Sequence, residues 1–325
     1  MNIGILGCGR IARTLAETMK KMEKEGIHLL AFASRSLSKA ESYCKDYHVQ
    51  KAYGSYEELA RDKEIDLVYI ATPHSEHKEN ALLCIQNHKN VLVEKAFTAN
   101  AKQAREVIEK AREENVFLAE AIWTRYMPMR KKIDEILEKG ILGKIRFLSA
   151  DLGYLIHDKE RLVDPKLAGG SLLDVGIYPL TFALMHNKSP IVEIRASGNK
   201  HENGVDLSDN ITLLHKDLSL SALTCTMECN TPRMAQISGE KGYMIIENVN
   251  NPEEIRVYDK ERNLIQRIER ENPISGYEYE LRECRDCLSK GKKEPDSMPW
   301  KETIHVMEIL DQIRKELNVS YPFES

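Results

Sequence analysis

The chain has 325 residues and a formal net charge of −4, and 42% of its residues are hydrophobic while 30% are charged. This length and composition favour two domains with packed cores and a solvated surface. The charge balance gives no basic footprint for nucleic acid. No apolar run approaches the ~20 residues that span a bilayer, and the amino terminus enters a strand-like segment too early for a signal peptide. We therefore expect neither a nucleic-acid nor a membrane partner.

The seven cysteines are scattered without a paired framework. Cys284 and Cys287 form a lone CxxC with no second pair to complete a zinc site. Reduced thiols in a cytoplasmic protein without a metal are the simplest interpretation.

The first third of the chain alternates short apolar runs with helical patterns, which is typical of a parallel sheet with crossover helices. Continuous apolar runs predict strands over 3–6, 29–33, 67–71, 91–93 and 116–119, with a helix over 101–114. Ser55 and Glu58 form a plausible capping box for another helix. The pattern predicts an α/β Rossmann domain, a doubly wound parallel sheet, over residues 1–121.

Around Trp123 the pattern changes. Pro128 suits the first turn of a helix that Gly140 would end. Strands separated by short polar turns follow over 144–152, 191–197, 210–215, 219–228, 233–239, 242–247 and 254–258, which favours an antiparallel arrangement. We expect an α+β domain with a large, mainly antiparallel open sheet over 122–325. An amphipathic helix at about 300–318 is free to pack back on the first domain.

A glycine-rich turn follows the first predicted strand and opens a predicted helix, the context in which such a motif signals a dinucleotide. In Gly7-Cys8-Gly9-Arg10-Ile11-Ala12, the first glycine permits the tight turn and the second lets the backbone approach a pyrophosphate. The helix N-terminus supplies unpaired N–H groups for the phosphates. A purely structural turn is the alternative.

The end of the second strand bears on which dinucleotide binds. An NAD-preferring site usually has an acid there, whereas this chain has Ser34-Arg35-Ser36. A guanidinium can bind a 2′-phosphate through forked, charge-assisted hydrogen bonds. NADP is therefore favoured over NAD, although Arg35 as an ordinary surface charge remains an alternative.

Several motifs in order along the chain carry a resemblance to the family of glucose-fructose oxidoreductase and inositol dehydrogenase. They are Glu94-Lys95, the run 120–125 (EAIWTR), the run 169–179 (GGSLLDVGIYP), Ala71-Thr72-Pro73 with His74 and His77, and Gly204-Val205-Asp206. Within that family the chain is most similar to the dimeric dihydrodiol dehydrogenases, which also oxidise D-xylose. The resemblance implies a hydride transfer between NADP(H) and a sugar or cyclic vicinal diol, and a homodimer through the C-terminal sheet.

The catalytic candidates are Lys95, Asp174 and Tyr178. Lys95 follows a strand whose end should face the ligand crevice of an open α/β sheet, where an ammonium could bond the reacting oxygen. Tyr178 is the candidate acid and base, and it would need cationic help because a free phenol has a pKa near ~10. Asp174 lies four residues earlier, on the same face if the segment is helical, and could orient Lys95 or bind a substrate hydroxyl.

Two departures from the family pattern affect this region. Many relatives carry histidine where this chain has Tyr178, although the resembled branches have tyrosine, and relatives often carry proline where this chain has Ala96. The remaining cofactor candidates are Thr72, Pro73, His74, His77, Glu94, Trp123 and Arg125; Trp123, His157, Asp174 and Tyr178 are the substrate candidates. For the two histidines and Trp123, a role in loop structure or packing is the alternative.

Two other functions remain open. The same residues could run in the opposite direction, as a reductase of a ketosugar or dicarbonyl compound. The fold also occurs in sensors that bind a dinucleotide without turnover. Lys95, Asp174 and Tyr178 weigh against a sensor, since a sensor has no need of proton-transfer groups.

Overall fold

The structure is a computed structural model that describes residues 1–324. It divides into two compact units. The first consists of Met1–Tyr126 and Pro273–Met307, and the second of Met127–Asn272 with residues 308–324. The helix α10 (Trp300–Leu317) contributes its first turns to the first unit and its remaining turns to the second.

A six-stranded parallel sheet forms the centre of the first unit, in the order β3-β2-β1-β4-β5-β6. Its strands are β1 (Asn2–Leu6), β2 (His28–Ala33), β3 (Lys51–Tyr53), β4 (Leu67–Ile70), β5 (Asn90–Glu94) and β6 (Leu118–Ala121). The strand order reverses between β1 and β4, so the crevice beyond the carboxyl ends of these two strands is the expected ligand position. The predicted doubly wound fold is confirmed.

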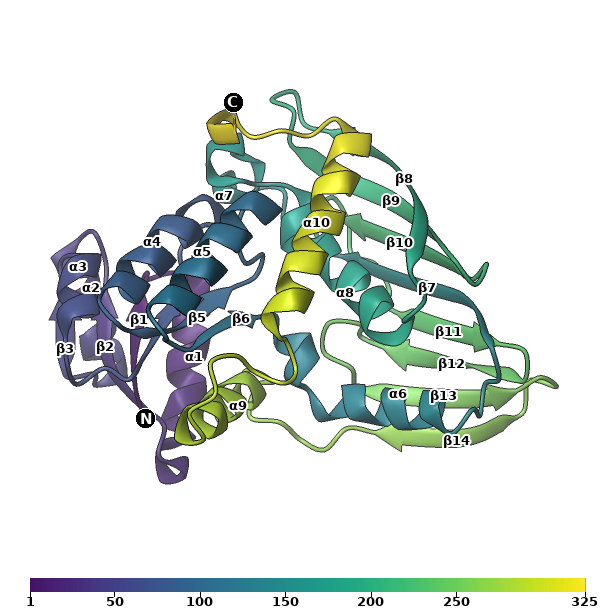
Figure 1. Cartoon of the computed structure of the whole chain (residues 1–325), viewed down its shortest axis with the longest axis horizontal. Helices are drawn as coiled ribbons and strands as arrows, with labels where there is room; N and C mark the ends of the chain where they lie inside the picture. The colour runs from purple at the N-terminus through teal and green to yellow at the C-terminus, as the bar shows by residue number, and fades with distance from the viewer. Residues whose placement is uncertain (325) are drawn as a thin grey trace. The chain divides into compact units, whose positions relative to one another are not determined.

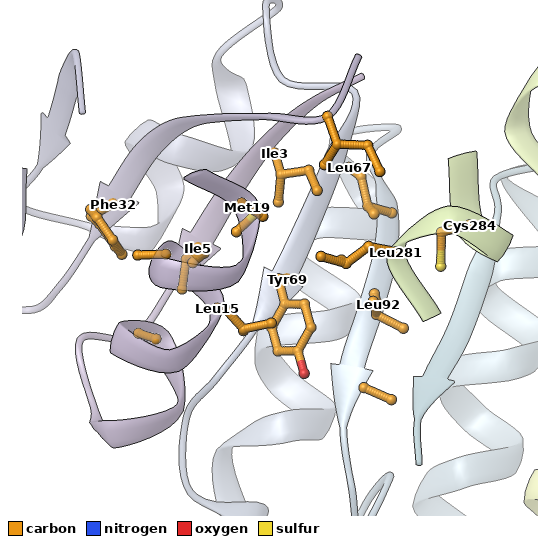
Figure 2. Packing of buried hydrophobic residues seen from close by; sticks show 14 of the residues in the cluster. Ile3, Ile5, Leu15, Met19, Phe32, Leu67, Tyr69, Leu92, Leu281 and Cys284 are labelled. Carbon is orange, nitrogen blue, oxygen red and sulfur yellow. The ribbon is translucent and has the colours of Figure 1, made fainter. Parts of the chain in front are cut away.

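Helices cover both faces of this sheet (Figure 1). They are α1 (Arg10–Lys20), α2 (Leu37–Tyr47), α3 (Tyr56–Arg61), α4 (His74–Gln86), α5 (Ala101–Glu113) and α9 (Glu278–Ser289). Residues of α1, α2 and α9 share one buried cluster with alternate residues of the strands, among them Ile5 and Tyr69 (Figure 2). On the opposite face, Gly4 of β1 lies against Leu59 of α3. The apolar runs of the strands are thus buried on both sides, as a parallel sheet requires.

The lone CxxC belongs to this core. Cys284 and Cys287 lie one turn apart on α9 and join the buried cluster with Leu281, and all seven cysteines are free. Their spacing places both thiols on the core face of a helix. Neither cysteine forms part of a zinc site among the residues described.

An eight-stranded sheet forms the second unit, in the order β14-β13-β12-β11-β7-β10-β9-β8. Neighbouring strands are antiparallel except β7 and β10, which run parallel. The strands are β7 (Ile145–Gly153), β8 (Ile191–Lys200), β9 (Asp206–His215), β10 (Leu220–Thr226), β11 (Ala235–Gly239), β12 (Gly242–Glu247), β13 (Glu254–Asp259) and β14 (Leu264–Glu269). The predicted α+β architecture with a mainly antiparallel sheet is confirmed.

Helices cover one face of the large sheet (Figure 1). They include α6 (Pro128–Glu138) and α8 (Ile177–His186); a π-helical turn, η4 (Leu172–Gly176), precedes α8. α6 begins at Pro128 and is followed by Gly140 with φ +65°, as predicted. The short helix α7 (Glu160–Val163) lies earlier in the chain.

One helical run, residues 165–186, is long and apolar enough to cross a membrane by length and composition alone, although most of it is buried inside the structure. The core helix of a folded domain passes the same test, so this single run is weak evidence for a membrane. The sequence pattern did not suggest it because Lys166 and Asp174 interrupt the apolar residues.

Candidate functional site

The carboxyl ends of the parallel strands gather most of the predicted cofactor residues of the first unit. Gly7 follows β1, Ser34 follows β2, Thr72 comes two residues after β4, and Lys95 follows β5. Parallel strands end at one edge of their sheet, so these residues share that edge. The remaining candidates in this unit, Trp123 and Arg125, lie in a 3₁₀ turn after β6 (η2, Trp123–Tyr126).

The two glycines of the turn differ in why they are glycines. Gly7 has φ +106°, and a Cβ atom there would lie 2.8 Å from the carbonyl oxygen of Ala71. Gly9 has an ordinary φ of −114° and would place a Cβ in open space, with no protein atom within 4 Å. The fold therefore requires glycine at position 7. At position 9 the protein leaves room for a ligand to approach the backbone.

Gly9 is also the N-cap of α1, and no side chain caps this helix end. The first turn, which contains Arg10 and Ile11, carries no acidic residue. The first N–H groups of a helix have no partner within it, and the helix dipole favours an anion there. The Cys8 side chain is buried beside the turn, and its thiol pKa is raised to about 11, chiefly by burial. These features fit a pyrophosphate.

The end of β2 presents a positive charge to solvent. Ser34 is buried and its Oγ accepts a hydrogen bond from Ser36 N (3.3 Å), whereas Arg35 is exposed. The pKa values of two neighbouring groups, the Tyr56 phenol and the Cys8 thiol, indicate which charges lie close by. Burial raises the pKa of the Tyr56 phenol, and the charge of Arg35 opposes that rise. The charge of Lys39 likewise opposes the rise that burial causes in the pKa of Cys8. Lys39 is a basic residue of α2 near the turn that the sequence interpretation did not select.

The loops after β4 and β5 are tied together by His77. Its ring nitrogens lie 2.9 Å from the carbonyl oxygens of Thr72 and Ala96. Burial lowers the pKa of His77 to about 4, opposed by these carbonyl groups. The ring of His74 packs edge-on against it, with centroids 5.6 Å apart. His77 therefore connects the loop that precedes α4 to the loop that follows β5, and it has this structural role whatever else it contacts.

Glu94 connects the end of β5 to a buried network. Its Oε2 accepts a hydrogen bond from Lys95 N (3.2 Å), and its Oε1 accepts one from the Tyr69 hydroxyl (2.5 Å). The same hydroxyl oxygen lies 3.2 Å from Oε1 of Glu280. A phenol has one proton to donate, so it can hydrogen-bond both carboxyl groups only if one of them carries a proton. Burial, together with the charge of Glu94, raises the pKa of Glu280 well above its usual value.

The 3₁₀ turn after β6 is buried rather than open. The Trp123 ring stacks on Tyr277, with centroids 4.4 Å apart and planes 13° apart. The Arg125 guanidinium pairs with Glu302 at 3.1 Å. Burial raises the pKa of the nearby Glu120 to about 7, against a hydrogen bond to Thr303 and the charge of Arg125. Both candidates thus have packing or ion-pair partners within the first unit.

In the second unit, Asp174 and Tyr178 occupy one helical stretch. Asp174 lies in the π turn η4 and Tyr178 at the start of α8, so the helical continuity that the sequence interpretation assumed is present. Single π turns of this kind occur frequently at functional sites. Oδ1 of Asp174 lies 3.4 Å from the guanidinium of Arg161 in α7. The Tyr178 side chain is buried. His157 is exposed and lies near Glu228, whose pKa is lowered chiefly by hydrogen bonds from Asn199 and Ser208 and to a smaller extent by His157.

Two features of this geometry were not apparent from the sequence. Tyr69 reads as an ordinary strand residue, and Glu280 lies more than two hundred positions away on a helix that the pattern did not predict. Lys39 lies four residues after Arg35, on the helix that follows. This spacing was the one feature of the sequence that could have indicated a second cation near the glycine turn. No group of three His, Cys, Asp or Glu side chains within residues 1–324 is arranged to hold a metal ion.

Comparisons with known proteins agree with this geometry. A family model described as "Oxidoreductase family, NAD-binding Rossmann fold" matches residues 1–121, and the GFO/IDH/MocA C-terminal domain matches residues 130–245. Trans-1,2-dihydrobenzene-1,2-diol dehydrogenase of Mus musculus is 35% identical over 98% of this chain and 97% of its own length. The enzyme of the same name from Xenopus tropicalis is also 35% identical, over 98% of each chain.

Solved structures show the same fold at lower identity. An aldose-aldose oxidoreductase from Caulobacter crescentus superposes with a TM-score of 0.87 at 20% identity, covering 98% of this chain and 97% of that one. A 3-ketoreductase from Actinomadura kijaniata superposes with a TM-score of 0.86 at 19% identity, covering 98% of each chain. With both family models matched in order and relatives aligned over nearly the full length, the chain belongs to the GFO/IDH/MocA family of oxidoreductases, whose first domain is a NAD-binding Rossmann fold.

Proposed function

We propose that this protein is an NADP-dependent dehydrogenase that oxidises a CH–OH group of a sugar or cyclic vicinal diol. The observation that carries the cofactor assignment is the exposed Arg35 at the carboxyl end of β2, where no carboxylate stands to repel a 2′-phosphate. Lys39 adds a second positive charge close to the Cys8 thiol of the glycine turn. The crystallised 3-ketoreductase relative was determined with NADP, which supports the same choice.

The first unit supplies the binding groups for this cofactor. The open space at Gly9 and the uncapped α1 N-terminus suit the pyrophosphate, and Ser34 with Arg35 suits the 2′-phosphate. We assign Thr72, Pro73, His74, Glu94 and Lys95 to the nicotinamide half, because they follow β4 and β5. The bound cofactor accepts or donates the hydride of the reaction. We assign Trp123 and Arg125 to the cofactor site as well, beside their partners Tyr277 and Glu302.

The chain's own side chains must handle the proton. Oxidation of an alcohol needs a base for the hydroxyl proton, and reduction of a carbonyl needs an acid aimed at its oxygen. We assign this proton to the Tyr178 phenol, with the Lys95 ammonium holding the substrate oxygen by a charge-assisted hydrogen bond. Asp174 is assigned to a substrate hydroxyl, for which a carboxylate is an acceptor; its Oδ1 also lies 3.4 Å from Arg161. His157 is proposed as a peripheral substrate contact.

The substrate class rests on the relatives. Those that align over nearly the whole chain are named for trans-1,2-dihydrobenzene-1,2-diol, and a structural relative is named for aldoses. Both compounds offer neighbouring oxygen atoms on a small carbon frame. A reductase of ketosugars would use the same groups in the opposite direction, as the name of the 3-ketoreductase relative illustrates.

Turnover assays test this proposal. The purified protein is incubated with NADP⁺ and a panel of aldoses and cyclic diols, with ketosugars and NADPH in the reverse direction, and the absorbance of reduced nicotinamide is followed. We expect turnover with at least one polyol of the panel. Tight cofactor binding without turnover in either direction would instead support a dinucleotide-binding sensor.

The open face of the large sheet supports a homodimer as part of the proposal. A row of half-exposed residues crosses six neighbouring strands in register, namely Leu214, Leu220, Phe147, Ser238, Tyr243 and Tyr258. Tyr243 and Tyr258 stack with centroids 4.8 Å apart. Exposed apolar patches of this kind mark protein interfaces, and a second copy of the chain presents the same patch.

We also propose a reducing, cytoplasmic location and no membrane or nucleic-acid partner. All seven cysteines are free thiols. Burial raises the pKa of several of them, including Cys84 to about 12. Free thiols throughout a chain of this size are usual where glutathione and thioredoxin keep cysteines reduced.

A further inference from the structure

Two aspartates lie buried beneath the segment that carries Asp174 and Tyr178. Asp206 begins β9 and Asp209 follows three positions later, and they are only 1% and 4% exposed. Residues three apart in a regular strand point to opposite faces of the sheet. Here the pairing between β8 and β9 slips, so that Asn199 opposes Ser208 while Lys200 opposes Asp206. This β-bulge re-aims one side chain and brings both carboxyl groups to the covered face.

Asp206 holds the backbone of η4 directly. Its Oδ2 accepts a hydrogen bond from Leu172 N at 2.6 Å, two residues before Asp174. A Cβ on Gly170, where φ is +137°, would lie 2.2 Å from Oδ1 of Asp206. Asp206 thus occupies the space that the glycine leaves empty. This packing explains a glycine of the 169–179 run by a contact of the protein with itself.

Asp209 supports the same segment from beneath through Cys225. Its Oδ2 accepts the thiol hydrogen of Cys225, with the two atoms 3.3 Å apart. The Cys225 sulfur lies 2.7 Å from where a Cβ on Gly176 would be. Both ends of η4 therefore rest on this group of side chains.

The remaining two carboxyl oxygens face a bonding problem. Oδ1 of Asp206 and Oδ1 of Asp209 are both buried without a donor from any other residue, and the two carboxyl groups lie close enough to each other to hydrogen-bond. Two ionised carboxylates cannot do so, because each can only accept. One proton between them satisfies both oxygens.

We propose that Asp206 and Asp209 share one proton, and that this protonated pair positions the helical segment bearing Asp174 and Tyr178. Asp206 is the ionised partner, since it accepts a backbone N–H and is attracted by the charge of Arg314. Asp209 carries the proton, since a weakly polar thiol is its other neighbour. Burial, followed by the charge of Asp206, raises the pKa of Asp209 to about 9.

The charged and titratable groups that face the two aspartates of β9 are Cys225 of β10, Arg314 of α10 and Tyr321 of the carboxyl-terminal segment. The hydroxyl of Tyr321 is buried. Arg314 is itself held by ion pairs with Glu324 and Asp311. Because Arg314 stays charged over the whole accessible pH range, titration of the pair is expected to reflect Asp209.

One isosteric variant tests whether the buried pair carries a proton. Asp209→Asn replaces a protonated acid by a neutral amide that can donate to Asp206 and accept from Cys225. In infrared difference spectra of protein labelled with ¹³C at the aspartate carboxyl carbon, we expect a protonated-carboxyl band at neutral pH that disappears in Asp209→Asn. It should persist in the exposed control Asp46→Asn. Absence of this band from the wild-type protein at neutral pH would overturn the proposal.

The pH dependence of stability separates a shared proton from simple packing. A carboxyl whose pKa is higher in the folded state binds its proton more tightly there, so its contribution to stability falls as pH rises from about 4 to about 9. This slope should be lost in Asp209→Asn, whose melting temperature should exceed that of the wild type at alkaline pH. An unchanged slope in Asp209→Asn contradicts the assignment of the proton.

The positioning role rests on the proposed function, and its readout is kinetic. Asp206→Asn exchanges a charged acceptor of Leu172 N for a neutral one, and we expect a lower kcat with an unchanged Kd for NADP⁺, while Asp209→Asn stays close to the wild type. Equal kinetics for the two variants and the wild type would remove the positioning role. If the wild type shows no turnover, the proposed function fails, but the spectra and melting curves still decide whether the proton is shared.

Discussion

Arg35 is an exposed guanidinium two residues after β2, between two serines and without a neighbouring acid in the Ser34-Arg35-Ser36 run. Hydrogen bonds that involve a charged group contribute about 1.5–3 kcal/mol. We therefore expect Arg35→Ala to raise the Kd for NADP⁺ by about tenfold to a hundredfold, while the Kd for NAD⁺ changes little.

Isothermal titration of both cofactors into wild-type and variant protein measures this difference. Arg61→Ala, another exposed arginine of the first unit at the end of α3, is a matched control that should bind both cofactors normally. Equal weakening of NADP⁺ and NAD⁺ by Arg35→Ala would show that Arg35 does not recognise the 2′-phosphate.

Lys95 and Tyr178 bear the chemical step in the proposed reaction. Loss of a positioned acid, base or oxygen-binding group typically lowers a rate by about 10²–10⁴-fold. Lys95→Ala and Tyr178→Phe should each lower kcat by an amount in this range and leave the Kd for NADP⁺ nearly unchanged. Steady-state kinetics and cofactor titration check both values. A variant that keeps its wild-type kcat is not part of the mechanism.

Glu280 offers a test of the network behind Lys95. The two carboxyl contacts of Tyr69 and the raised pKa of Glu280 point to a protonated Glu280, so the neutral amide in Glu280→Gln should preserve the fold and the cofactor site. Glu280→Ala leaves a buried hydroxyl short of a partner, which costs about 1–3 kcal/mol of unfolding free energy. Urea denaturation compares the two variants. If Glu280→Gln is as destabilised as Glu280→Ala, Glu280 is ionised in the folded protein.

At the scale of the elements, the junction of β1 and α1 contains two glycines for which we expect different roles. Gly7 is needed by the fold, and Gly9 is needed by cofactor binding. Gly7→Ala meets a positive φ and the Ala71 carbonyl, and should cost about 1–3 kcal/mol of stability. Gly9→Ala fits its backbone and meets no protein atom, so its melting temperature should stay close to the wild type. Its methyl group should nevertheless obstruct the pyrophosphate and weaken NADP⁺.

Melting curves without cofactor and titrations with it measure the two effects separately. A Gly9→Ala variant that binds NADP⁺ as tightly as the wild type would mean that the phosphates do not approach this turn. A destabilised Gly9→Ala variant would mean that the position is needed by the fold instead.

The strands buried on both faces were predictable because their apolar runs are continuous, as in β1, β4 and β5. The short strand β3 (Lys51–Tyr53) was missed because it is only half buried and holds a lysine. The exposed edge strand β14 was missed for a similar reason, since a mostly exposed strand needs no alternating pattern. Helix α9 was missed because two of its core positions are cysteines set among many charges.

The candidate site was predictable where a motif fixes a local shape, such as the glycine turn or the capping box at Ser55. Contacts between distant residues were not, because no periodicity links Tyr69 to Glu280 or Asp206 to Leu172. The bulge that aligns Asp206 with Asp209 depends on the partner strand, whose register a single sequence does not reveal.

At the scale of the whole molecule, the open sheet face predicts the oligomeric state. Phe147 lies on the central strand β7 within the half-exposed row. A lysine there would place a charge in the proposed interface, so Phe147→Lys should convert a dimer to a monomer in light scattering after gel filtration. Leu218→Lys, in an exposed turn, is the control that should remain dimeric. A monomeric wild type, or a dimeric and folded Phe147→Lys variant, would contradict dimerisation through this face.

The division into units also belongs to this scale. Residues 273–307 belong to the first unit although they follow the whole large sheet in the chain, and they bring Glu280 to Tyr69. Local patterns do not reveal such a return, because each element would read the same wherever it packed. From the sequence, the one expectation that bore on this return was the helix at about 300–318, which was free to pack back on the first domain.

In the proposed reaction, the protein moves a hydride from a polyol carbon to NADP⁺. D-xylose deuterated at its anomeric carbon, incubated with the enzyme and NADP⁺, tests this directly when the reduced cofactor is analysed by mass spectrometry. We predict NADPH that carries one deuterium, and unlabelled NADPH from unlabelled D-xylose. If D-xylose is not the substrate, the most active polyol of the panel is used with deuterium at its oxidised carbon. Binding of NADP⁺ without any reduced cofactor, across the whole panel, would contradict the account.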